Sequence, residues 1–140
     1  MRAIAPMLAI TLLAACAGNP VRRDEQDLAL YRQHAGAPVD SFSYLGRFDS
    51  WTPLGDESLV LWVSPSRAWL LDVDGPCNEL PFAHAVKVSA STGRVHARFD
   101  YVTPLATGIR ALPCRIREIR PVDVPALREA RRRMDPEPSP

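Results

Sequence analysis

The segment from residue 41 to residue 120 consists of short apolar stretches separated by proline and glycine, and this pattern limits the fold more than any other feature. The whole chain has 14 prolines among its 140 residues, a share about twice the usual ~5%. Because proline breaks a helix interior and glycine favours turns, long helices are excluded from this segment. The sequence predicts a mainly β fold, either a small antiparallel barrel or a curled sheet.

Two mainly apolar stretches, residues 58–64 and 67–73, flank a proline–serine pair that favours a tight turn. A two-residue loop at this turn places Trp62 opposite Trp69. Because both faces of this hairpin are apolar, we expect it to lie at the centre of the sheet with both faces covered. An earlier strand is predicted over residues 44–51.

A second hairpin is predicted from residues 85–91 and 94–102, which alternate between apolar and polar side chains around a Thr-Gly turn. In this register Val86 meets Phe99 and Val88 meets Ala97 on the buried face. On the solvent face, Lys87 lies opposite Arg98, an unfavourable arrangement of like charges unless an anion intervenes.

Start and stop signals predict a short helix over residues 25–34, because acidic side chains fill its first turn, basic ones its last, and glycine follows. A last strand is predicted over residues 114–120 and a short helix over residues 125–132. No internal repeat separates these elements. We therefore expect a single β-rich domain over residues 24–123, with residues 124–140 forming the short carboxy-terminal helix and a disordered tail.

The amino-terminal segment has the three parts of a secretory signal: a positive end, an apolar stretch and small residues. It ends in Leu-Ala-Ala-Cys, a tetrapeptide that resembles a bacterial lipobox. In proteins with that motif the chain is cut before the cysteine, which then carries lipid. We expect residues 1–15 to be the signal peptide, Cys16 the lipidated residue and residues 16–23 a tether. An ordinary signal peptide with a chance cysteine is the alternative.

Location and partners follow from the same segment and from the charge. Residue 17 is alanine rather than aspartate, which by resemblance to known lipoprotein sorting favours the outer membrane over the inner one. We therefore expect a lipid-anchored protein on the periplasmic side of the outer membrane. With a formal net charge of only +1, the chain has no general field that attracts nucleic acid, and no nucleic-acid partner is expected.

Two cysteines, Cys77 and Cys114, remain once Cys16 is used by lipid. The oxidising periplasm makes a disulfide between them the default expectation. A metal pair and a catalytic thiol are the alternatives. Neither has support, because the sequence lacks a Cys-x-x-Cys motif and no histidine lies within five residues of either cysteine.

The sequence lacks the common catalytic signatures, namely Gly-x-Ser-x-Gly, His-Glu-x-x-His and a glycine-rich phosphate loop. Asp72-x-Asp74-Gly75 resembles the start of a calcium loop, but the third oxygen ligand and the glutamate at the twelfth position are missing. A polar turn that closes a strand explains it better. We predict no catalytic residue, no metal site and no cofactor.

A small-ligand or hydrolytic domain is the alternative function. It requires a concave site in which Trp62 or Trp69 meets His84 or His96. Tryptophans along strands more often pack in the core. A histidine within hydrogen-bond reach of the other histidine or of a carboxylate would favour this alternative.

Arginine is concentrated near the carboxy terminus, where residues 110–133 contain eight arginines against three acidic residues. We predict that these arginines and the second hairpin form one surface that binds anionic lipid or cell-wall polymer. The alternative is a solvated face, with Asp100 supplying the counter-charge to Arg98. The residues of the predicted anion-binding surface are Lys87, Arg98, Arg115, Arg117, Arg131 and Arg132.

Four segments together carry a resemblance to a known family: Leu-Ala-Ala-Cys at 13–16, His-Ala-Gly-Ala-Pro-Val-Asp at 34–40, Asp-Val-Asp-Gly-Pro-Cys at 72–77, and Cys-Arg-Ile-Arg-Glu-Ile-Arg-Pro-Val-Asp at 114–123. With them the chain resembles the small proteobacterial lipoproteins and secreted proteins grouped under a domain of unknown function. The resemblance covers residues 28–127 and implies one compact domain with paired cysteines. It implies no activity, cofactor or catalytic residue. We expect an envelope protein with a non-catalytic binding or structural role, whose partners are the membrane, cell-wall polymer or another envelope protein.

Overall fold

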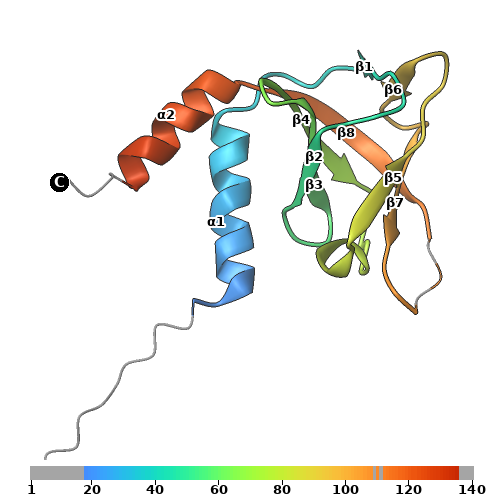
Figure 1. Ribbon diagram of the computed structural model, residues 1–140, viewed down its shortest axis with the longest axis horizontal. Helices are drawn as coiled ribbons and strands as arrows, with labels where there is room; N and C mark the ends of the chain where they lie inside the picture. Colours follow the sequence, from blue (N-terminus) through green and yellow to red (C-terminus); the bar gives the residue numbers. More distant parts are fainter. Residues whose placement is uncertain (1–17, 109, 111, 136–140) are drawn as a thin grey trace, which may run out of the picture.

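The computed structural model describes residues 18–108, 110 and 112–135. Figure 1 shows the helices beside a strongly curled sheet. Within the described residues the chain forms eight strands, one short 3₁₀ helix and two α-helices. In chain order these are α1 (Pro20–Gln33), β1 (Ser41–Ser43), β2 (Ser50–Pro53), β3 (Ser58–Ser64), β4 (Arg67–Val73), η1 (Leu80–Phe82), β5 (Ala85–Val88), β6 (Arg94–His96), β7 (Tyr101–Leu105), β8 (Cys114–Val122) and α2 (Val124–Met134).

Six strands form one antiparallel sheet in the order β2-β3-β4-β8-β7-β5, and β1 pairs with β6 in a separate two-stranded ladder. Backbone bonds join the segments around this ladder to β8: the Val39 N–H donates to the carbonyl of Ile119 at 2.8 Å, and the Arg98 N–H to that of Ile116 at 2.6 Å. The sheet curls into a nearly closed barrel (Figure 1). The predicted mainly β fold with one amino-terminal and one carboxy-terminal helix is confirmed.

The sheet has a hydrophobic core on each face because β3 and β4 send apolar side chains to both. Leu59, Leu61 and Leu71 lie in the core inside the curl. Val60 and Leu70 lie on the other face, where the helices contribute Tyr31, Val124 and Leu127 to a second core. Successive side chains of a strand alternate between faces, so uninterrupted apolar strands fit between two cores. The predicted central position of this hairpin is confirmed.

The central hairpin has the predicted strand bounds, but the predicted register is wrong beyond its turn. Ser64 pairs with Arg67, as a two-residue loop requires, and an irregularity between Trp62 and Ser64 then shifts the pairing. Trp62 therefore faces Ala68 instead of Trp69. An extra residue on one strand of a pair increases the local twist, which suits a sheet that must curl.

The predicted pairing of residues 85–91 with residues 94–102 is wrong beyond its turn. Strand β6 pairs with β1, and β5 pairs with β7, which sets Lys87 opposite Thr103. The predicted juxtaposition of Lys87 with Arg98 is therefore also wrong. Its physical cause is a second reversal of the chain between β6 and β7, where Arg98 has a φ of 70°.

The same reversal exchanges the expected positions of two neighbouring residues. Phe99, expected in the core, is 74% exposed, whereas Asp100, expected on the solvent face, is 4% exposed. The Asp100 carboxylate accepts hydrogen bonds from the backbone N–H of His96 and from the hydroxyl of Ser89, both at 2.7 Å. A short polar side chain that bonds to the nearby backbone stabilises such a turn.

Helix α1 begins at Pro20, not at residue 25, which corrects the predicted span of 25–34. Asn19 caps it by accepting a hydrogen bond from the Val21 N–H at 3.2 Å, and proline suits the first helical position because it lacks the N–H that a helix start leaves unpaired. The residues from Pro20 onward that were assigned to the 16–23 tether are therefore helical.

Three other predicted elements can be compared directly with the structure. The strand predicted over residues 44–51 is mostly a loop between β1 and β2, where Gly46 has a φ of 82° that interrupts extended backbone. The last strand and the last helix, predicted over 114–120 and 125–132, are confirmed, and each extends slightly further in the structure.

Candidate functional site

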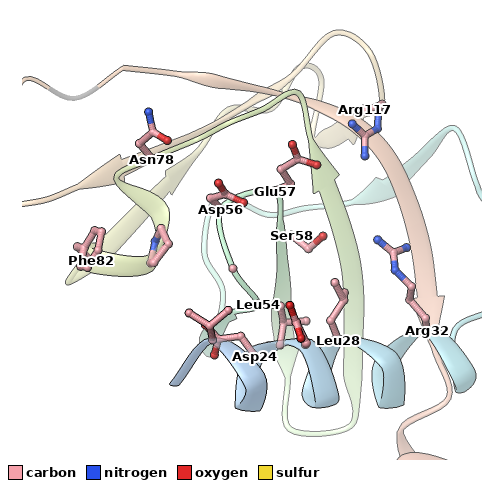
Figure 2. Close-up of a pocket in the computed structure, with 14 residues that line it drawn as sticks. Asp24, Leu28, Arg32, Leu54, Asp56, Glu57, Ser58, Asn78, Phe82 and Arg117 are labelled. Carbon is pink, nitrogen blue, oxygen red and sulfur yellow. The ribbon is translucent and has the colours of Figure 1, made fainter. Parts of the chain in front are cut away.

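A cleft of about 610 Å³ opens between α1, the loop before β3, the η1 turn and β8. One wall is a single face of α1 (Figure 2), formed by Val21, Asp24, Glu25, Leu28 and Arg32. These residues recur every three or four positions, the spacing that places side chains on one side of a helix. The helix thus presents an apolar stripe with carboxylates near its start and a guanidinium near its end.

The facing wall is the loop of residues 54–58, which backbone hydrogen bonds fix to the sheet. The carbonyl of Glu57 accepts from the Val73 N–H at 2.8 Å, and that of Asp56 from the Cys77 N–H at 2.9 Å. Glu57 also packs closely over Gly75, where an added Cβ would lie 2.6 Å from its Cγ. The remaining lining residues are Leu54, Gly55, Ser58, Asn78, Pro81, Phe82 and Arg117.

A buried carboxylate joins the two walls at one end of the cleft. Arg32 donates two hydrogen bonds to Asp72, one to each oxygen, at 3.1 and 2.9 Å, and the Ser58 hydroxyl donates a third at 2.6 Å. The Asp72 side chain is 5% exposed and that of Arg32 is 43% exposed. The forked guanidinium matches a carboxylate in two places at once, so this contact fixes both the position and the rotation of α1.

A disulfide fixes the part of the cleft formed by η1 and β8. Cys77 and Cys114 are bonded with an S–S distance of 2.02 Å and a Cα–Cα distance of 6.1 Å, which confirms the predicted pair. The bond joins the chain just before Asn78 and η1 to the first residue of β8. Two elements that line the cleft, η1 and β8, are thus covalently connected.

Charge is unevenly distributed along the cleft. Figure 2 shows Asp24 and Asp56 toward the same side as Phe82, with Arg32 and Arg117 on the opposite side. Among the described residues, no ion pair or side-chain hydrogen bond engages Arg117 or the carboxylates of Asp24 and Asp56. Phe82 is 79% exposed. The cleft therefore offers unpaired charge of both signs and an open aromatic side chain.

The structure does not gather the predicted anion-binding residues at one place. Lys87 lies on β5, whereas Arg131 and Arg132 lie on α2, on the other side of the molecule in Figure 1. Arg132 pairs with Glu129 at 3.0 Å, and the guanidinium of Arg131 lies 5.1 Å from the ring centroid of Tyr31.

The other three predicted residues of that surface also lie apart. Arg98 pairs with Asp40 at 3.1 Å. Arg115 donates to Asp74 at 2.9 Å, and the hydrogen bond and negative charge of Asp74 raise the pKa of the Arg115 guanidinium. Arg117, also on β8, is the one member of the predicted set that lines the cleft.

The tryptophans and histidines proposed for an alternative site do not line the cleft. Trp69 stacks on Phe42, with ring centroids 4.8 Å apart, and Trp62 packs in the core under the helices. The His96 Nδ1 does approach a carboxylate, that of Asp100, at 3.3 Å. However, the carboxylate lies between the histidine and a serine, whereas activation of a hydroxyl requires the imidazole in that central position.

The structure also bears on metal binding and on the membrane. Across residues 18–108, 110 and 112–135, no group of three or more His, Cys, Asp or Glu side chains is placed to hold a metal ion. In that same part of the chain, neither helix has the length and apolar character of a membrane span. Cys16, the predicted lipidation site, lies outside the described residues.

The cleft itself is absent from the sequence-based predictions. Its lining comes from four separate segments of the chain, so no local motif marks it. The one available signal was the spacing of Val21, Asp24, Leu28 and Arg32 on a helix. The predicted helix began too late for that stripe to be recognised.

Comparison with known proteins gives a family but no activity. A model described as a family of unknown function (DUF6491) matches residues 1–137. No curated protein and no solved structure matches the chain. The geometry of the chain itself is thus the basis on which its function can be inferred.

Proposed function

Because the chain belongs to the DUF6491 family, whose function is unknown, we propose from its own residues that it is a lipid-anchored envelope protein with a non-catalytic binding role. The cleft beside α1 is its binding site. One observation carries this proposal: an open apolar strip and unpaired charges are held on walls that an ion pair and a disulfide fix in place. Preformed concave sites with a few placed polar groups are typical of ligand binding.

The chemistry offered by the cleft favours binding over reaction. Among the described residues, its lining contains carboxylates, guanidinium groups, small polar side chains and apolar surface, with no histidine and no cysteine. The one hydroxyl in the lining, that of Ser58, donates to the Asp72 carboxylate at 2.6 Å. The lining is therefore equipped for ion pairing and apolar contact, which retain a ligand without changing it.

The anchoring part of the proposal rests on the amino-terminal sequence and on the start of α1. The lipobox-like tetrapeptide ends at Cys16, and α1 begins at Pro20. Three intervening residues span at most about 10 Å. In the lipidated protein the first turn of α1, which carries Val21, lies next to the membrane. Alanine at position 17 supports the periplasmic side of the outer membrane.

A second contact with the envelope is supported by the position of α2. This helix carries Arg128, Arg131, Arg132 and Arg133, and Arg131 packs on Tyr31 of the anchor-bearing helix α1. Tyr31 lies near the end of α1 away from the anchor, so these exposed arginines provide a separate contact with anionic lipid headgroups or cell-wall polymer, with about 1 kcal/mol of attraction for each base near the surface. The contact supports retention at the envelope, and the cleft remains the proposed binding site.

Site-specific photocrosslinking in intact cells tests the binding role. A photoreactive amino acid replaces Phe82, which lines the cleft, or Phe99, which does not and is a matched control with 74% rather than 79% exposure. We expect discrete adducts from position 82 and none of the same mass from position 99. Identical adducts from both positions, or none from position 82, would refute the cleft as the binding site.

Fractionation tests the anchor separately. Cys16→Ser should yield an uncut or soluble protein that no longer sediments with membranes. If this variant keeps both the membrane fractionation and the electrophoretic mobility of the wild type, the lipid anchor is wrong.

A further inference from the structure

We propose that the cleft binds short peptides with free ends, and that it holds the amino group near Asp24 and Asp56 and the carboxylate at Arg117. This inference rests on the proposed binding function and adds the class of ligand and its direction. It starts from the distribution of charge around the cleft, where Asp24 and Asp56 lie toward one side and Arg117 toward the other, with Glu57 between them (Figure 2).

The two arginines of the cleft have different capacities for a ligand. Arg32 uses both terminal nitrogens of its guanidinium for Asp72, so its charge is largely neutralised within the protein. Arg117 is exposed and has no ion-pair partner among the described residues. Its planar fork can bind a carboxylate through two parallel hydrogen bonds. Arg117 is therefore the group that receives the carboxyl end.

The opposite side is suited to a cation. Asp24 on α1 and Asp56 on the facing loop both line the cleft, and neither is engaged by a basic side chain of the described residues. An ammonium group between them would offset the repulsion of two like charges and donate hydrogen bonds to both carboxylates.

The distance between the two charged ends sets the length of the ligand. Asp24 and Arg32 are eight residues apart on α1, a rise of roughly 12 Å at 1.5 Å per residue, and Arg117 lies on the same side of the cleft as Arg32 (Figure 2). An extended peptide advances about 3.3 Å per residue. A peptide of three to five residues therefore spans the cleft, and a single amino acid is too short to reach both ends.

The apolar strip between the ends distinguishes a peptide from other charged ligands. Leu28 lies between Asp24 and Arg32 on the helical wall, where it faces the middle of the ligand. The exposed ring of Phe82 lies on the same side as Asp24 and Asp56 (Figure 2), where it can contact the first side chains of the peptide. An anionic lipid headgroup would be repelled by the carboxylates of Asp24 and Asp56. A polyamine leaves Arg117 without a partner and gains little from Phe82. A peptide with apolar central side chains satisfies all three features.

Calorimetric titration of the full chain, purified in detergent, tests this inference. The probes are the tetrapeptide Ala-Leu-Leu-Ala with free ends, its N-acetylated form and its C-amidated form. Each modification removes one terminal charge, and with it a charge-assisted contact at one end of the cleft. We expect each to weaken binding about tenfold relative to the free peptide.

Variants of residues in the cleft test which charged group holds which end of the peptide. Arg117→Gln should weaken binding of the free peptide about tenfold and make amidation of the peptide ineffective. The double variant Asp24→Asn with Asp56→Asn should also weaken binding of the free peptide about tenfold, and it should make acetylation of the peptide ineffective. Arg47→Gln and Asp49→Asn are matched controls, because both residues are exposed and lie outside the cleft. These controls should bind the free peptide as the wild type does.

Several outcomes would overturn the inference. Capped peptides that bind as well as the free one, or controls that lose as much affinity as the cleft variants, would show that the charged ends play no part. Absence of peptide binding together with adducts at position 82 would refute the ligand class and leave the binding function standing. Absence of both would refute the two proposals together.

Discussion

Replacement of Arg32 by methionine tests whether one ion pair holds α1 against the sheet. The variant leaves Asp72, whose side chain is 5% exposed, with a hydrogen bond from Ser58 alone. Removing one partner of a fully buried ion pair costs about 3–5 kcal/mol. Because the Arg32 side chain is 43% exposed, water screens part of the interaction and solvates part of what remains. We therefore expect Arg32→Met to lower the free energy of unfolding by about 2–3 kcal/mol.

A double-mutant cycle separates this pair from general damage to the helix. Asp72→Leu removes the buried charge, so adding Arg32→Met to it should cost much less than Arg32→Met costs in the wild type. The expected coupling between the two positions is about 2 kcal/mol. Arg22→Met is the matched control, because Arg22 is an exposed arginine on the same helix without an ion pair among the described residues. It should change stability by less than about 0.5 kcal/mol.

The assay is urea unfolding followed by tryptophan fluorescence, in which the midpoint and the slope are fitted separately. A lower midpoint with an unchanged slope for Arg32→Met is the expected result. A shift no larger than that of the Arg22→Met control, or effects of Arg32→Met and Asp72→Leu that simply add, would refute the idea that this contact fixes the helix.

Two further predictions concern the disulfide and a buried tyrosine. Replacing Cys77 and Cys114 together by alanine should lower the free energy of unfolding by about 3–4 kcal/mol. The variant's urea midpoint should no longer respond to reductant. A wild-type urea midpoint that reductant does not change would contradict this prediction. Burial raises the pKa of Tyr44 above its ordinary value of 10.0, so the unfolded chain releases this proton first. The stability that protonated Tyr44 contributes is fully present below its ordinary pKa of 10.0. It is lost as the pH rises through the pKa that Tyr44 has in the folded chain. Tyr44→Phe should therefore lose less stability than the wild type between about pH 9 and about pH 11, and equal losses would contradict the assignment.

The elements that could be predicted from the sequence are those whose signals are local. Strands β3 and β4 have the predicted bounds because both of their faces are buried, so each is a mainly apolar stretch, and the Pro-Ser turn between them marks the end of one and the start of the other. The pairing of Cys77 with Cys114 followed from the number of cysteines and the expected compartment. In each case the evidence lay in adjacent residues or in a simple count.

Register and partner choice could not be predicted because several arrangements satisfy the same pattern. Val95 and Ala97 are buried, as the alternation required, but that alternation does not say whether β6 pairs with β5 or with β1. The irregularity after Trp62 shifts the pairing by one position without changing which residues are apolar. The curl of the sheet selects these arrangements, and curl is a property of the whole fold.

The start of α1 shows how one misplaced boundary hides a site. The helix predicted over residues 25–34 leaves Val21 and Asp24 outside the helical stripe. Asn19 with Pro20 is the arrangement found, and it extends the helical stripe to the full wall of the cleft. The facing wall comes from residues more than twenty positions away, which no periodic pattern could have connected to the helix.

The six-stranded sheet ends at β2 and β5, and this has a consequence for how copies of the protein coexist. A terminal strand leaves backbone groups that can recruit a strand of another molecule and begin aggregation. Strand β2 contains Pro53, which has no N–H to offer, and β5 carries the exposed Lys87 within its short apolar run. Both features discourage strand addition. Lys87 thus discourages β5 of one molecule from pairing with a strand of another, which favours separate copies even at high local concentration.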